Sequence, residues 1–230
     1  MHGFAALGYA IYHRTQTGEG QYLDLSMVDA MYHMHEYNVH GRSVAGVSFN
    51  PKRMGAHHEM IAPFGVFKGP SGYFVIAVLQ LQWAGMCQAL GRPELEEDSR
   101  FINGGSRARH QDLLIEIIEA WAASFPHNDA VLAALETARV PAGPVLTPIE
   151  TLEHDYFLDR GMVRTVTDPI LGEVQVPGFP FKFSAQSELP KFEAPLLGQH
   201  NAVVLSGMLG YDAERIAALE RDQVIVSAAR

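Results

Sequence analysis

The sequence predicts a mixed fold of helices and strands, of the α/β or α+β class. Residues 112–124 carry leucine, isoleucine and tryptophan at helical spacing, which is typical of an amphipathic helix. The runs PFGVFK and YFVIAVL are rich in β-formers and flank a Gly-Pro-Ser-Gly turn at 69–72, so they predict a hairpin. MVRTVTD and GEVQVPG predict a second antiparallel pair after Gly161. These helix and strand patterns occur together in one chain of 230 residues, which is long enough for one or two globular domains.

Composition limits the kinds of molecule that the protein is expected to bind and the compartment in which it is expected to work. The net charge of −9 argues against nucleic-acid binding, and no basic run argues for it. Cys87 is the single cysteine, so the sequence excludes an intrachain disulfide and favours a reducing compartment. The apolar run at 4–12 is too short to span a bilayer and does not resemble a signal peptide. We therefore expect a cytoplasmic protein with no membrane partner.

The first fifty residues predict a helix, a strand and a second helix. Residues 2–14 read as a helix that is apolar nearly all round, which we expect to be buried by neighbours that the preceding sequence does not supply. Glycines at 18 and 20 end it. Residues 21–26 predict a short strand. Ser26 and Asp29 form a capping-box-like start for a helix that we expect to end at Gly41.

The remaining elements follow the hairpin in order. We expect a helix at 80–90 stopped by Gly91, a polar connector at 94–111, helices at 112–124 and 128–138, and a strand at 140–147. Thr147, Pro148 and Glu150 give a cap, a first-turn proline and a first-turn acid for another helix. An extended, proline-rich stretch at 179–198 precedes two short helices near 200–208 and 212–222.

The loop that precedes the hairpin is the candidate site. It carries Gly55 and two adjacent imidazoles, His57 and His58, immediately before a buried hairpin. A mobile segment held by a rigid scaffold is a common place for a ligand. The alternative is a surface loop whose histidines face solvent, and the pattern alone leaves both interpretations open.

Six separated motifs resemble the family III CoA-transferases, the group that includes formyl-CoA transferase and carnitine CoA-transferase, together with their relatives the α-methylacyl-CoA racemases. In chain order they are TGEGQYLDLSMVDA, RMGAHHEMIAPFGVFKGPSGYFVIAV, ALGRPELEEDSRF, VPAGPVLTPIE, GFPFKFS and APLLGQHN. The resemblance implies the C-terminal part of a Rossmann-like large domain with an inserted small α+β domain. It implies large-domain segments at 1–45 and 143–230 and a small domain with linkers at 46–142.

The resemblance also implies the chemistry. The family's nucleophilic aspartate lies a few residues before the helix that opens this chain, so we expect no catalytic residue within it and no activity from the chain alone. Asp24 and Asp29 match positions that read as structural. Acyl-CoA and a carboxylate would be the substrates, with no further cofactor, and two subunits would interlock as a homodimer. Adjacent histidines rarely ligate one metal ion, so we expect no metal site.

The resemblance assigns a role to the candidate loop. Gly55, Ala56, His57 and His58 align with the glycine-bearing loop that closes over the family's reacting thioester, and we expect them to bind substrate. The imidazoles could hydrogen-bond a carboxylate, although His58 stands where the family often has proline. Two alternatives remain: a racemase of the same fold, working by proton transfer at the α-carbon, and a non-catalytic fragment or partner subunit.

Overall fold

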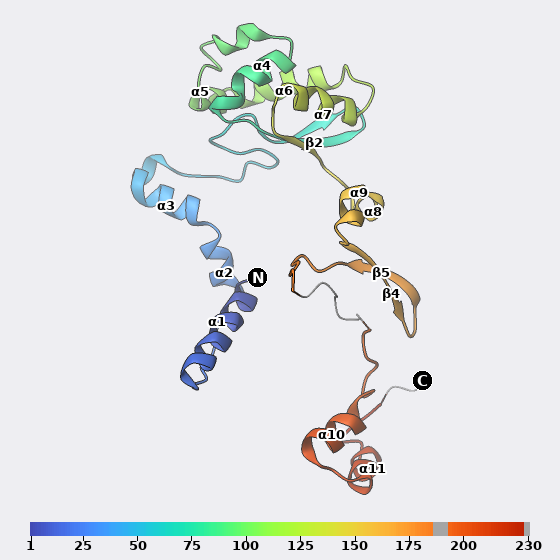
Figure 1. Cartoon of the computed structure of the whole chain (residues 1–230). Coiled ribbons are helices and arrows are strands. Elements are labelled where there is room, and N and C mark those ends of the chain that lie inside the picture. Colours follow the sequence, from blue (N-terminus) through green and yellow to red (C-terminus); the bar gives the residue numbers. More distant parts are fainter. Residues whose placement is uncertain (186–192, 228–230) are drawn as a thin grey trace. The chain divides into compact units, whose positions relative to one another are not determined.

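The computed structural model describes residues 1–185 and 193–227 and divides the chain into two compact units, Met1–Val145 and Leu146–Arg230. Each unit mixes helices and strands, as the sequence predicts (Figure 1). The first unit contains α1 (His2–Thr17), α2 (Met27–His33), α3 (Glu36–Ala45), β1 (Phe64–Gly69), β2 (Gly72–Ala77), α4 (Trp83–Ala89), α5 (Gly104–Arg109), α6 (Gln111–Ala122), α7 (Asn128–Thr137) and β3 (Ala142–Pro144). Short 3-10 helices occupy Gly46–Ser48, Gln80–Gln82 and Pro93–Glu96.

The predicted hairpin is confirmed and forms two strands of a three-stranded antiparallel sheet, in the order β1-β2-β3. Phe64 lies opposite Ala77, and Gly69 lies opposite Gly72 at the turn. The strand predicted at 140–147 is shorter than expected and pairs with β2. This sheet places the chain that precedes Phe64 at the β1 edge.

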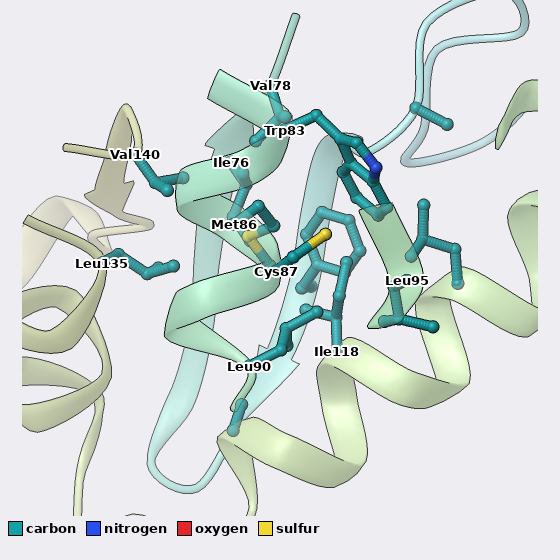
Figure 2. Close-up of a cluster of buried hydrophobic side chains, with 14 of the residues drawn as sticks. Ile76, Val78, Trp83, Met86, Cys87, Leu90, Leu95, Ile118, Leu135 and Val140 are labelled. Carbon is teal, nitrogen blue, oxygen red and sulfur yellow. The ribbon is translucent and has the colours of Figure 1, made fainter. Parts of the chain in front are cut away.

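The hydrophobic core lies between this sheet and three helices. α6 packs against β1, α7 against β2 and β3, and α4 against α7. Figure 2 shows Ile76, Met86, Cys87 and Ile118 converging in this core. The helical period predicted at 112–124 is confirmed, because Leu114, Ile118 and Ala122 are buried on one face of α6.

The stretch predicted as a polar connector, 94–111, is instead part of the core. It contains a 3-10 helix and α5, and it buries Leu95, Phe101 and Arg107 almost completely. The prediction was wrong because it weighed the many charged residues and overlooked the few side chains that point inward. Charged residues usually lie on the surface, so composition places Arg107 there, yet this residue is 1% exposed.

The first fifty residues form helices that bury no side chain completely. α1 ends at Gly18 in the left-handed conformation, as predicted, but its apolar residues are exposed, with Tyr9 at 77%. Residues 21–26 form no strand within the described chain, since no neighbouring strand offers a ladder to them. The expectation of a strand there was wrong.

The helix predicted at 26–41 is two helices. Ser26 caps α2 by accepting from the amides of Val28 and Asp29, as expected. The chain breaks at 34–35 and α3 then continues beyond Gly41 to Ala45. Gly41 therefore does not end the helix. It allows close packing, because a β-carbon there would lie 2.7 Å from the ring of Phe49.

The second unit follows the prediction closely. It contains α8 (Pro148–Glu153), α9 (Asp155–Asp159), β4 (Val163–Asp168), β5 (Gly172–Pro177), α10 (Asn201–Leu209) and α11 (Ala213–Arg221). Thr147 and Glu150 form the expected reciprocal cap of α8. The extended stretch predicted at 179–198 lies partly outside the described residues. Over residues 1–185 and 193–227, no helix has the length and apolar character needed to cross a membrane.

Candidate functional site

The candidate loop is closed at its base by a charged hydrogen bond. The backbone N–H of Lys52 donates to Oε2 of Glu59 at 2.8 Å. A carboxylate that accepts a backbone amide in this way fixes the two ends of the intervening segment. The predicted site residues Gly55, Ala56 and His57 lie inside this closed segment, and Glu59 is engaged in holding it.

The loop is also attached to the edge of the sheet. The amide of Val66 donates to the carbonyl of Ala56 at 3.0 Å, and the amide of His58 donates to the carbonyl of Phe64 at 2.8 Å. His57 thereby lies opposite Gly65 in an antiparallel bridge. This part of the loop consequently lies alongside the edge of β1, and the core under that strand determines its position.

His57 directs its ring into the domain. The imidazole packs edge-to-face on Phe67, with ring centroids 4.9 Å apart, and its Nδ1 is buried with no hydrogen-bond partner among the described residues. Burial lowers the pKa of His57, and the negative charges of Glu119 and Asp112 oppose this shift only in part. The side chain therefore favours the neutral form and anchors the loop.

His58 caps a tight turn. Its Nδ1 accepts hydrogen bonds from the amides of Met60 and Ile61, at 3.1 and 3.2 Å. The ring stacks on Phe64 with centroids 5.6 Å apart and also faces Tyr37. Because Nδ1 serves as an acceptor, a neutral His58 carries its proton on Nε2. Nε2 is therefore the ring nitrogen of His58 that is left to hydrogen-bond a ligand.

Gly55 and Ala56 form the exposed end of the loop. Gly55 has φ 68°, in the region that favours glycine, and a β-carbon there would meet no atom within 4 Å. Both residues are exposed. The glycine therefore serves the backbone conformation of this exposed end of the loop.

A hollow of about 190 Å³ lies beside the loop and is shared with α3. Tyr37 and Asn38 line it from the helix, and the loop contributes Lys52, Met54, His57 and Glu59. The hydroxyl of Tyr37 approaches Sδ of Met60 at 3.5 Å, which joins the two walls. The hollow combines amide, imidazole and ammonium groups with the carboxylate of Glu59 and apolar surface, a mixture that suits a small polar group.

Other titratable side chains lie elsewhere. Asp29, His33 and His40 line a separate hollow of about 600 Å³ along α2 and α3. Cys87 is buried in the core, where burial raises the pKa of its thiol to about 12. Within the described ranges, no cluster of three or more His, Cys, Asp or Glu is arranged to hold a metal ion.

The sequence analysis missed three residues that contact the loop or the turn after it. Tyr37 lies in α3, and Arg107 and Gln111 lie in the stretch read as a connector. Gln111 donates to the carbonyl of His58, and Arg107 donates to the carbonyl of Ala62. Backbone carbonyls carry no signal in a sequence pattern, so their side-chain donors could not be recognised there.

Comparison with known proteins matches one family. The model of CoA-transferase family III matches residues 1–201. The succinyl-CoA:mesaconate CoA-transferase of Haloarcula hispanica is 34% identical over 198 residues, covering 85% of this chain and 48% of that protein. The formyl-CoA:oxalate CoA-transferase of Streptomyces coelicolor is 29% identical over 242 residues, covering 98% and 58%.

A solved structure gives the same result for the fold. The crystal structure of a CAIB/BAIF family protein from Brucella suis superposes with a TM-score of 0.69 at 28% identity, over 88% of this chain and 52% of that chain. The chain thus spans about half the length of the relatives it matches.

Proposed function

The chain belongs to CoA-transferase family III, and we propose that it forms part of an enzyme that transfers coenzyme A from an acyl-CoA to a carboxylic acid. The observation that supports this most directly is the loop at Gly55. The exposed end of this loop is held at the edge of the sheet, and its neighbours Met54 and His57 line a hollow of about 190 Å³. The named CoA-transferases among its relatives favour transfer over racemisation.

We propose the large and small domains as the sequence resemblance implies them, with segments 1–45 and 143–230 in a Rossmann-like domain and 46–142 as the inserted domain. The cytoplasm is the proposed location, since a single cysteine suits a reducing compartment. In the complete protein two copies would interlock as a homodimer.

The proposed reaction proceeds through a carboxylate nucleophile from the part of the fold that this chain does not cover. The carboxylate attacks the acyl carbon and releases CoA thiolate, leaving a mixed anhydride. The thiolate then attacks the carboxylate's own carbonyl carbon, which releases the donor acid and leaves an enzyme-bound CoA thioester. The acceptor carboxylate attacks this thioester and releases CoA thiolate, leaving a second mixed anhydride. The thiolate then attacks the carbonyl carbon of the acceptor, which forms the new acyl-CoA and frees the enzyme carboxylate.

The loop would act on the oxyanions of these steps. Preorganised N–H groups at Gly55 and Ala56 would stabilise the negative charge that develops on the attacked carbonyl, and closure would exclude water from a hydrolysable anhydride. His57 and His58 would hold these groups in place through the contacts described above.

The test is an assay of CoA transfer from succinyl-CoA to mesaconate and from formyl-CoA to oxalate. We expect no turnover from the 230-residue chain alone and measurable turnover when it is joined to the half of a curated relative that it does not cover. Turnover by the chain alone, surviving a second purification step, would place the nucleophile within it. Exchange of an α-proton in D₂O without CoA transfer would instead favour the racemase.

A further inference from the structure

Gln111 holds the start of the turn that follows the candidate loop. This first residue of α6 is 7% exposed, and its Nε2 donates to the carbonyl of His58 at 2.9 Å. The bond spans 53 positions in sequence. The bond is partly buried, so loss of this amide would leave the carbonyl of His58 without its side-chain donor.

Arg107 holds the end of the same turn. Its side chain is 1% exposed, and its Nε donates to the carbonyl of Ala62 at 2.7 Å. The other two nitrogens donate to the carbonyl of Phe101 and to Oε1 of Gln80, both at 3.0 Å. All three acceptors are uncharged, and the guanidinium lies 4.7 Å from the ring centroid of Trp83.

A buried guanidinium that bonds neutral carbonyls is a costly arrangement. Desolvation penalises the charged form and lowers the pKa of Arg107, and the side chain stays charged because an arginine cannot be deprotonated in a protein. A methionine or leucine would fill the same space without this cost. The planar fork of arginine, however, is suited to fixing several oxygens at defined positions.

We propose that Arg107 and Gln111 are positioning residues that clamp both ends of the turn from His58 to Ala62 and thereby set the candidate loop. Both come from the corner where α5 meets α6. Between the two held carbonyls, His58 closes the turn through its own bonds to Met60 and Ile61. The role in turnover rests on the proposed function, whereas the clamp itself does not.

Hydrogen exchange of the 230-residue chain tests the clamp with Gln111→Glu. The ionised carboxylate has the shape of the amide but only accepts hydrogen bonds, so it would face the carbonyl of His58 with no donor. We expect the amides of His58, Met60 and Ile61 to exchange at least about tenfold faster. The amide of Ala77, which bonds the carbonyl of Pro141 across the sheet, should keep its protection.

The matched control is Gln88→Glu, which adds the same charge at an exposed position of α4. It should leave every one of these amides unchanged. Equal acceleration of the loop amides and Ala77 in Gln111→Glu would mean a general loss of stability and would overturn the proposal. Unchanged exchange at His58 would overturn it as well.

Arg107→Lys is the second variant, with exposed Arg109→Lys as its control. Lysine keeps the charge and loses the fork, so we expect faster exchange at Met60 and Ile61 with the fold retained. The assembled transferase is the chain joined to the half of a relative that it does not cover. In this protein, both clamp variants should lower kcat at least about tenfold, while the affinity for CoA changes less than about twofold. If the unsubstituted assembly shows no transfer, the proposed function fails and the exchange data still decide the clamp.

Discussion

His57 packs against the backbone of Gly65 so closely that a β-carbon added to Gly65 would lie 2.5 Å from the imidazole Nδ1 and 2.5 Å from the carbonyl oxygen of Ala56. No real β-carbon tolerates such distances from backbone. The absence of a side chain at the second position of β1 therefore allows the loop to lie on the strand. This contact connects the candidate site to the core through Phe67, on which His57 also packs.

Gly65→Ala should release the loop from the strand. We expect a loss of about 1–3 kcal/mol in the free energy of unfolding, the usual cost of forcing extra volume into a packed site. The measurement is urea denaturation. Gly143→Ala is the control, because a β-carbon there meets only Cγ1 of Val75, at an ordinary 3.8 Å. Equal effects from the two substitutions would contradict the close contact seen at His57.

The stability of the loop should fall as the medium becomes acidic. Burial lowers the pKa of His57, so the unfolded chain binds this proton more readily than the folded one. The contribution of neutral His57 is complete above the unfolded value of about 6.5 and is lost as pH falls through the lower folded value.

His57→Phe isolates this effect, since phenylalanine keeps the packing on Phe67 and cannot titrate. We expect the unfolding free energy of the variant to depend less on pH than that of the unsubstituted chain between pH 7 and 5, measured by urea midpoints. Parallel curves for the two proteins would show that His57 is not the titrating group.

Gly55→Val should slow catalysis in the assembled transferase far more than it weakens CoA binding. The space around Gly55 is open, so the expected damage comes from its φ of 68°, which a β-branched residue adopts at a cost of about 1–2 kcal/mol. A displaced amide at an oxyanion typically costs about 10²–10³ in rate. Steady-state kinetics beside a CoA titration would measure both quantities.

Gly91→Val provides the matched control for this substitution. Gly91 has φ 66°, meets no atom within 4 Å of its β-carbon position, and ends α4. The Gly91→Val variant should lose a similar amount of stability and keep its turnover. Near-normal turnover in Gly55→Val would return the loop to the alternative interpretation, a surface loop with no part in the chemistry.

The chain in isolation should associate through α1. Leu7 and Ile11, one turn apart, are 54% and 52% exposed, and Tyr9 is 77% exposed. Apolar surface of this extent on one helix usually finds a partner. Light scattering should show a mass above that of the monomer, which Leu7→Lys combined with Ile11→Lys reduces. Glu116→Lys combined with Ala120→Lys, on the exposed face of α6, should leave the mass unchanged.

The sequence by itself determined the local structure where short-range chemistry dominates. Gly69 to Gly72 defined the hairpin, Thr147 and Glu150 the start of α8, and the spacing of Leu114 and Ile118 the buried face of α6. Each of these depends on residues within one or two turns of each other. The same short-range reading failed at 21–26, since a strand exists only where another strand pairs with it.

Tertiary structure alone decided how the candidate loop is held. The sequence marks the histidine pair as a possible contact for substrate, and the fold adds that His57 packs on Phe67 and that His58 closes a turn. Arg107 and Gln111 reach this turn from 45 and 53 positions away and bind its backbone carbonyls. Every residue has such a carbonyl, so no pattern of side chains marks the two that need a donor. Only the path of the folded chain brings them together.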